Sequence, residues 1–186
     1  MLSFCEQQLQ WCNQFHMEHS RSFEGYLQER GLPDVILPFT VLRRLDFVLL
    51  KTKKSVLETH EKYYGKLEDS SGILMKTSGQ SFYNLSKYAL KKLLSDPENI
   101  KHNMFDYING FSQNMLEVMG GFKLRERLIY LAEKDLLFKV VQKFSEADLN
   151  PEAVTNHDMG YIFEELIRKF SEENNEEAGE HFTPRE

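Results

Sequence analysis

The 186-residue sequence contains only two cysteines, Cys5 and Cys12, so covalent crosslinks cannot be the basis of its fold. If both lie on one helix, they are about 10 Å apart along its axis, which is too far for a disulfide bond. A chain of this length buries roughly 70% of its unfolded surface and needs no such crosslink. Low cysteine usage is typical of a reducing compartment, and we expect a cytoplasmic protein.

A long uncharged apolar run and a strong positive charge are also missing. The densest apolar stretch, residues 34–57, is too short and too charged to cross a membrane, and the first residues lack the basic and apolar regions of a signal peptide. The net charge of −6 argues against a strongly basic nucleic-acid binder. However, residues 171–186 alone carry −5, so the first 170 residues are nearly balanced at −1 and can hold a basic face.

The sequence lacks the signatures of common catalytic sites. It has no phosphate-binding loop, no glycine-rich dinucleotide turn and no nucleophile elbow, because Gly120 and Gly121 stand alone between two helical patterns. Cys12, His16 and His19 share a helix face, but a fourth ligand is missing, so we expect no metal site. Acidic residues are scattered, and we assign no catalytic residue.

Apolar residues instead recur at helical spacing through most of the chain. No alternating strand run and no internal repeat is present. A glycine- and serine-rich stretch, residues 66–81, is predicted to form a loop. The predicted helices cover residues 3–29, 34–57 with a weaker extension to 63, 82–94, 98–119, 123–144 as one or two helices, and 157–175. The fold class is therefore all-α, an irregular multi-helix domain of about seven helices with an acidic linker tail.

The helix predicted over residues 34–57 is the element around which the others are expected to pack. It is apolar over most of its circumference, and few polar residues other than Arg43, Arg44 and Asp46 interrupt it. A helix of this kind is a buried helix. Pro38 must lie in its first turn or cause a kink, because proline lacks an amide donor.

Basic residues form four groups that could meet phosphates. On the helix predicted over residues 82–94, Lys87 and Lys91 are one turn apart, with Tyr83 and Tyr88 near them. A solvated helix face explains the same residues, and the nearly neutral charge balance favours that reading. The groups are Arg43 and Arg44; Lys51, Lys53 and Lys54; Lys87, Lys91 and Lys92; and Lys123, Arg125 and Arg127.

Three stretches resemble one known family. The run DVILPFTVLRRLD at residues 34–46, followed by FYNLSKY at residues 82–88, resembles the N-terminal helical domain of the methylation (M) subunit of type I restriction–modification systems. The end of the chain, GEHFTPR at residues 179–185, resembles the Gly-x-aromatic-aromatic-Thr-Pro segment that opens the catalytic domain of this family. His181 stands at the first aromatic position. The resemblance covers nearly the whole chain.

The resemblance implies a parent protein that transfers a methyl group from S-adenosylmethionine to adenine in a specific DNA sequence. Its implied partners are DNA, a specificity subunit that reads the bases, a second methylation subunit and a restriction subunit. The helical domain is implied to close over DNA and to contact other subunits. Phe182, Thr183 and Pro184 would line the adenosylmethionine pocket of the parent. The residues expected at the DNA backbone are Lys87, Lys91 and Lys92, followed by Arg43 and Arg44.

Two motifs of that family are absent from the sequence. These are the glycine-rich cofactor loop and the Asn-Pro-Pro-aromatic motif, which holds the flipped adenine; Asn150 and Pro151 are followed by Glu152. We therefore expect an inert chain that binds no cofactor, with a helical domain at residues 1–175 and the severed start of a catalytic domain at 176–186. Residues 172–186 are expected to be poorly ordered or held by a neighbouring chain.

The alternative is a stand-alone helical protein-interaction module without an enzymatic parent. Such a module would bind a partner helix through the apolar face of residues 157–170.

Overall fold

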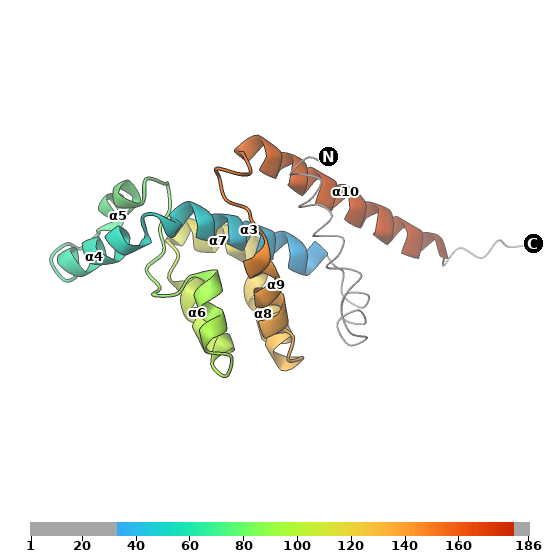
Figure 1. The fold of residues 1–186 in the computed structure, drawn as a ribbon, viewed down its shortest axis with the longest axis horizontal. Helices are drawn as coiled ribbons and strands as arrows, with labels where there is room; N and C mark the ends of the chain where they lie inside the picture. The colour runs from blue at the N-terminus through green and yellow to red at the C-terminus, as the bar shows by residue number, and fades with distance from the viewer. Residues whose placement is uncertain (1–32, 181–186) are drawn as a thin grey trace, which may run out of the picture. The chain divides into compact units, whose positions relative to one another are not determined.

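The computed structural model describes the backbone of residues 33–180 and the side chains of residues 35–168. Contacts divide the chain into two compact units, one of residues 38–150 and one of Met1–Leu37 with Pro151–Glu186. Residues 33–180 contain helices and no strand, apart from an isolated antiparallel bridge between Asn84 and Phe111, so the all-α prediction is confirmed. The described part holds eight α-helices and one 3-10 helix (Figure 1).

The predicted central helix is present as α3, Pro33–Leu50. Its polar residues Arg43, Arg44 and Asp46 are buried together with its apolar ones, which confirms a buried helix. Pro38 lies inside the helix, beyond its first turn, and is the first residue of the 38–150 unit. Because proline has no amide hydrogen, the helical bond at this position is missing.

The predicted helix does not continue to residue 57 without interruption. The chain turns at Lys51 and Thr52, where the Thr52 amide donates to the Leu49 carbonyl at 3.1 Å, and α4 follows as Lys53–Tyr63. Thr52 Oγ1 also lies 3.3 Å from the Leu49 oxygen, so this side chain satisfies a carbonyl at the end of α3. The result is that Lys53 opens a new helix.

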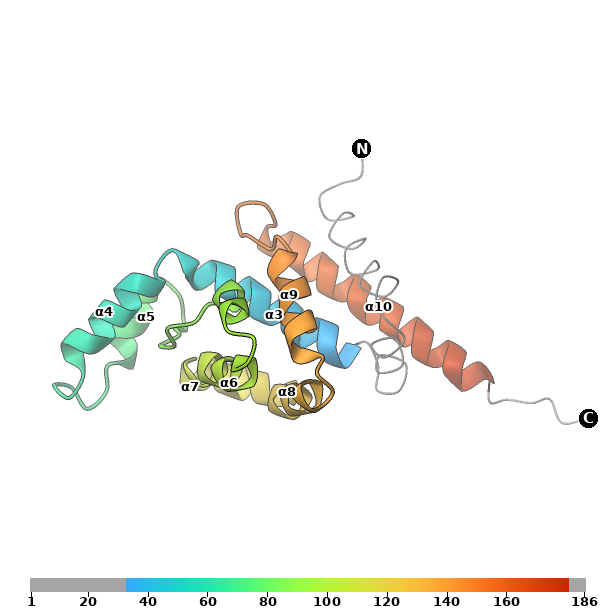
Figure 2. The same ribbon diagram turned by 60° about the horizontal axis from the view of Figure 1, so that its bottom comes forward.

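The loop predicted over residues 66–81 is wrong, because Ser71–Ser78 form helix α5. The side chain of Asp69 accepts the Ser71 amide at 2.8 Å, and Gly79 ends the helix with φ of +68°. Both are ordinary helix-end features. Leu74 is buried, and α5 lies beside α4 in both views of the ribbon (Figure 2). The helix pair therefore gains its stability by packing.

The prediction of a helix over residues 82–94 is also wrong for residues 82–89. Residues 82–89 are irregular, with an isolated bridge at Asn84, and only Leu90–Ser95 form a helix, the 3-10 helix η1. The irregular part is fixed by tertiary hydrogen bonds: the Leu85 amide donates to Gly110 at 2.7 Å and the Ser112 amide donates to Tyr83 at 3.0 Å. These bonds replace the local bonds of a helix. Lys87 and Lys91 therefore do not share a helix face.

The helix predicted over residues 98–119 is divided in two at Gly110. The two parts are α6, Ile100–Asn109, and α7, Gln113–Gly121. A Cβ atom on Gly110 would lie 2.5 Å from the Ser86 nitrogen. The close approach of residues 84–86 therefore requires glycine at this position. The sequence predicts one or two helices over residues 123–144, and the structure has two. They are α8, Leu124–Glu133, and α9, Leu137–Glu146.

The last helix, α10, is Asn156–Glu180, so it ends five residues beyond the predicted end at residue 175. The predicted domain boundary at 175/176 thus lies within a helix. Thr155 begins the helix with reciprocal bonds to Asp158: Thr155 Oγ1 lies 2.7 Å from the Asp158 carboxylate and accepts the Asp158 amide at 3.2 Å. Of the predicted apolar face, Met159, Ile162 and Leu166 are buried.

Several predictions fall outside the described residues. They concern the helix over 3–29, the pair Cys5 and Cys12, the group Cys12, His16 and His19, and residues 181–186 with Phe182, Thr183 and Pro184. Within the described part, every helix is too short or too polar to cross a membrane.

Candidate functional site

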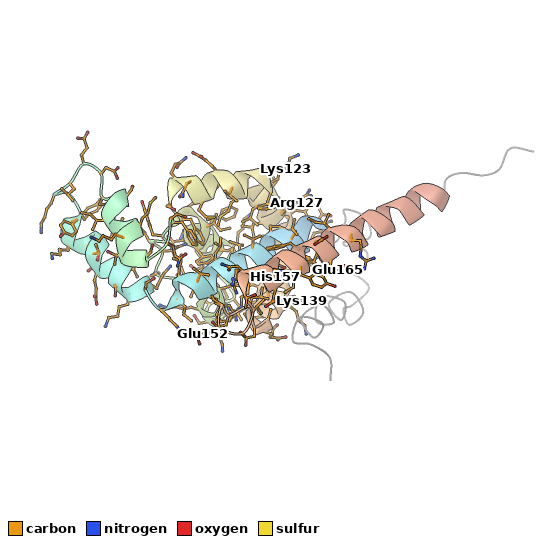
Figure 3. All side chains as sticks on the ribbon, turned by 90° about the horizontal axis from the view of Figure 1, so that it is seen from above. Lys123, Arg127, Lys139, Glu152, His157 and Glu165 are labelled. Carbon is orange, nitrogen blue, oxygen red and sulfur yellow. The ribbon has the colours of Figure 1, made fainter. Side chains whose placement is uncertain are left out.

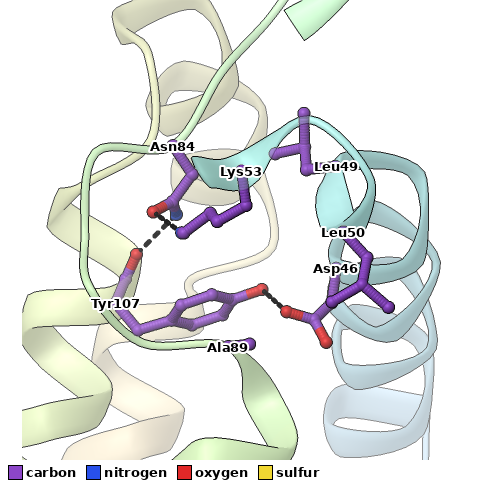
Figure 4. A pocket seen from close by; sticks show the side chains of 7 residues that line it. All are labelled: Asp46, Leu49, Leu50, Lys53, Asn84, Ala89 and Tyr107. Carbon is purple, nitrogen blue, oxygen red and sulfur yellow. Dashed lines mark hydrogen bonds between the residues drawn. The ribbon is translucent and has the colours of Figure 1, made fainter. Parts of the chain in front are cut away.

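A buried polar network joins α3, η1 and α6. Asp46 Oδ1 on α3 accepts the Leu90 amide at 3.0 Å. It also accepts the Tyr107 hydroxyl at 3.1 Å, as Figure 4 shows. Its other oxygen lies 3.5 Å from Arg43 Nη1. The amide at the start of η1 and a hydroxyl of α6 are thus held by one carboxylate. The carboxylate thus supplies an acceptor to two buried donors, the Leu90 amide and the Tyr107 hydroxyl.

Burial controls the protonation of this network. Loss of solvent raises the pKa of Asp46, although its hydrogen bonds from Leu90 and Tyr107 and the charge of Arg43 act in the opposite direction. Burial also raises the pKa of Tyr107 well above its usual value, and the neighbouring Asp46 carboxylate adds to this. Tyr107 is therefore a neutral donor at physiological pH.

Lys53 is the second charged group in this region. Its Nζ donates to Asn84 Oδ1 at 2.7 Å and lies 5.7 Å from the centre of the Tyr107 ring. The Asn84 side-chain amide in turn donates to the Tyr107 carbonyl at 2.8 Å, as Figure 4 shows. Burial lowers the pKa of Lys53 to about 8; Lys92 adds to the effect, and Asp46 and Asp106 oppose it.

The space between these residues is too small for a substrate. The cavity lined by Asp46, Lys53, Asn84 and Tyr107 measures about 10 Å³. That volume is about the minimum for one water molecule. The network therefore organises the fold and fixes the segment of residues 84–95.

Arg43 and Arg44, expected at the DNA backbone, lie in the protein interior. Arg43 donates to the carbonyls of Ala147 at 2.9 Å and Ser145 at 2.8 Å, and its guanidinium lies 4.0 Å from the centre of the Phe47 ring. Arg44 donates to the Leu149 carbonyl at 2.9 Å. The two side chains thus hold the segment that follows α9, and carbonyl oxygens take the donors that a phosphate would need.

Lys87, Lys91 and Lys92 are exposed, but the structure groups them differently from the predicted helix face. Lys87 lies in a bend before η1, with its Nζ 5.1 Å from the centre of the Tyr88 ring. Lys92 Nζ lies 3.4 Å from the Lys87 carbonyl. Lys87 and Lys92 are therefore neighbours. The positive charge of Lys92 also contributes to the lowered pKa of Lys53.

Sequence reasoning did not select Lys53, although it belongs to the second basic group. One local signal is available: the apolar pattern weakens after Lys51. A new helix that begins there would give Lys53 and Lys54 different surroundings. Its burial depends on Asn84 and Tyr107, which lie 31 and 54 residues further along the chain, and no local pattern contains that information.

The fourth basic group lies at α8. Lys123 directly precedes this helix, and Arg127 lies one turn further along (Figure 3). Arg125 donates to Asn109 Oδ1 at 2.7 Å at the edge of a hollow of about 280 Å³ along α6, α7 and α8. The hollow is lined by Ile108, Asn109, Leu116, Met119, Gly120, Leu124, Arg125 and Glu126. Its lining is mainly apolar and includes two charged residues, Arg125 and Glu126.

Among the described residues, no group of three or more His, Cys, Asp or Glu side chains could hold a metal ion. The three residues expected to line an adenosylmethionine pocket, Phe182, Thr183 and Pro184, lie outside the described residues.

Comparison with known protein families identifies the family of the chain. A family model described as the HsdM N-terminal domain matches residues 28–144, which include the buried polar network and the lysines of residues 87–92. No curated protein and no solved structure matches the chain.

Proposed function

The chain belongs to the HsdM N-terminal domain family, and on this premise we propose that it holds DNA and contacts other subunits as part of a type I restriction–modification methylation subunit. The family match over residues 28–144 is the observation that carries the proposal. The exposed lysines 87, 91 and 92 lie inside the matched range and supply the charge for backbone contact.

The physical support is the combination of charge and rigidity in the segment of residues 82–95. Lysines bind phosphates by displacing counterions, and a fixed backbone lowers the entropy lost when they do so. The Leu85 and Leu90 amides anchor this segment to Gly110 and Asp46. Arg43 and Arg44 instead donate to carbonyls of residues 145–149 and hold the end of α9 against α3.

The parent subunit would transfer a methyl group from S-adenosylmethionine to adenine, and its partners would be a specificity subunit, a second methylation subunit and a restriction subunit. We place it in the cytoplasm. The cofactor supplies the methyl group. The catalytic Asn-Pro-Pro-aromatic motif is absent from these 186 residues, so the chain itself is expected to be inert and to bind no cofactor.

The test is the triple variant Lys87→Ala, Lys91→Ala and Lys92→Ala in the assembled enzyme. DNA affinity should fall, and the slope of log affinity against log salt should flatten by about one for each lysine that contacts a phosphate. A matched triple variant, Lys62→Ala, Lys66→Ala and Lys76→Ala, removes the same charge from α4, its following turn and α5. An unchanged affinity and slope in the first variant would assign its lysines to a solvated surface.

The second candidate is a stand-alone interaction module that binds a partner helix through residues 157–170. In the structure, Met159, Ile162 and Leu166 on this face are already buried, while Ile167 is 53% exposed. Only part of the face is therefore open. Reading the gene beyond Glu186 distinguishes the two candidates: a glycine-rich loop and an Asn-Pro-Pro-aromatic motif would exclude a stand-alone module.

A further inference from the structure

The hollow along α6, α7 and α8 shares no lining residue with the small cavity beside Lys53. Its volume is about 280 Å³, and Ile108, Leu116, Met119 and Leu124 make its lining mainly apolar. Pockets that hold a whole small molecule measure about 300–1,000 Å³. The hollow lies below this range, and its size suits one or two apolar side chains from a partner protein.

Two glycines end α7 at this place. Gly120 lines the hollow, and Gly121 is the last residue of the helix. A Cβ atom at either position would meet nothing within 4 Å, so packing within the described part of the chain does not require glycine at either one. Glycine lowers the stability of a helix, and it is often found where a second backbone approaches closely. Gly120 leaves room for such an approach over the hollow.

Arg125 is exposed at the edge of the hollow, and two neutral groups hold its side chain in place. Its Nη2 donates to Asn109 Oδ1 at 2.7 Å, and its guanidinium carbon lies 5.3 Å from the centre of the Phe105 ring. Among the described residues it forms no ion pair with a carboxylate. A guanidinium group has five N–H donors, so Arg125 can still bind a carboxylate through two of them. Because the side chain is already held, it loses less rotamer freedom on binding.

The charges near the hollow indicate the chemistry of the partner. Residues 123–127 contain three bases and one acid, a net charge of +2, and Lys123 and Arg125 are exposed. This charge attracts a carboxylate. Glu126 also lines the hollow and repels a nucleic-acid backbone, which brings a negative charge with every phosphate. An amphipathic protein helix with one carboxylate beside its apolar side chains fits both the charge and the apolar lining.

We propose that the hollow along α6, α7 and α8 is the docking site for an amphipathic helix of another subunit, which places apolar side chains over Gly120 and a carboxylate on Arg125. The inference rests on the subunit contacts of the function proposed above, and it names their surface and their chemistry. It does not depend on the DNA contacts of Lys87, Lys91 and Lys92.

The experiment is stepwise dilution of the assembled enzyme, with mass photometry to measure the fraction of complexes that retain each subunit. Gly120→Leu places a side chain in the hollow, so one subunit should be lost at a concentration at least about tenfold higher. Gly121→Leu is the matched control. It adds the same side chain one residue further on, outside the lining of the hollow, and should change the dissociation by less than about twofold. Circular dichroism checks that both variants are folded, as the open space at both positions predicts.

Changes at Arg125 test the carboxylate of the partner. Arg125→Ala should weaken retention of the same subunit by about tenfold, and Arg125→Glu should weaken it further, because two carboxylates then face each other. Lys134→Ala removes one positive charge from the exposed residue at the other end of α8 and should have no effect. A partner that carries a base at this position would instead bind Arg125→Glu more tightly, and that result would overturn the inference.

The outcomes separate this inference from the proposed function. Loss of one subunit in Gly120→Leu and Arg125→Glu, but not in Gly121→Leu and Lys134→Ala, supports the inference. If every variant retains every subunit, the inference is wrong and the DNA contacts still stand. If the variants retain their subunits but lose affinity for DNA, the hollow contacts DNA, so the inference is wrong and the DNA function is supported. If the unchanged methylation subunit assembles with no other subunit, the proposed subunit contacts and the inference are both wrong.

Discussion

Replacing Asp46 with Ala should be one of the most destabilising single substitutions in this chain. The carboxylate accepts the Leu90 amide at 3.0 Å and the Tyr107 hydroxyl at 3.1 Å, and both donors are buried. Each buried donor left without an acceptor costs about 1–3 kcal/mol. Arg43 also loses its buried counterion at 3.5 Å. Part of this loss is offset because the buried carboxylate is itself costly to desolvate, and we expect a net cost of about 3–5 kcal/mol.

Tyr107→Phe provides a graded comparison at the other end of the same bond. It removes the hydroxyl but leaves Asp46 with the Leu90 amide and Arg43, so the expected cost is about 1 kcal/mol. In the double variant, the second change should cost almost nothing, because the hydroxyl has already lost its acceptor. The two effects should therefore be clearly non-additive.

The assay is urea unfolding at pH 7, followed by circular dichroism, with the free energy of unfolding taken from midpoints at a constant m-value. Glu98→Ala is the control, because Glu98 is exposed and should change stability by less than about 0.5 kcal/mol. A cost below about 1 kcal/mol for Asp46→Ala, or additive costs in the double variant, would show that the network does not hold η1 to α3 and α6.

The remaining predictions concern Gly110 and the activity of the chain. Gly110→Ala would place a Cβ atom 2.5 Å from the Ser86 nitrogen and should lower the free energy of unfolding by about 1–3 kcal/mol, whereas Gly72→Ala in α5, with open space around it, should raise it by up to about 1 kcal/mol. A similar effect of both changes in the same urea assay would refute the close approach at Gly110. Incubation of the chain with labelled S-adenosylmethionine and DNA should give no transfer above background, and measurable turnover would refute the expected inertness.

The buried helix α3 could be predicted because its information is local. Apolar residues occupy most of its circumference, and this pattern needs no knowledge of the rest of the chain. The partners of its buried charges could not be predicted in the same way. Arg43 bonds to Ala147 and Asp46 to Tyr107, at sequence separations of 104 and 61 residues. Sequence reasoning could name these charges as interruptions, but it could not show what they bind.

The error at residues 82–89 has a related cause. Leu85, Tyr88, Ala89 and Leu93 are spaced as on a helix, and this spacing outweighed the polar residues between them. In the structure, Asn84 and Ser86 direct their side chains to Tyr107 and Asp106. Asn and Ser side chains commonly compete with helical backbone bonds in this way. Gly110, whose missing side chain allows Ser86 to approach closely, lies inside the helix that the sequence predicts over residues 98–119.

The positions of the lysines are therefore set mainly by the buried contacts of the segment that carries them. Lys87 and Lys92 stand on a segment that is fixed at Leu85 by Gly110 and at Leu90 by Asp46. Lys53 is fixed through Asn84, which also bonds to α6. A change at Asp46 or Gly110 that leaves the chain folded should thus weaken the proposed contact with the DNA backbone, although neither residue is basic. The segment of residues 82–95 thus carries both contacts of the buried network and the exposed lysines.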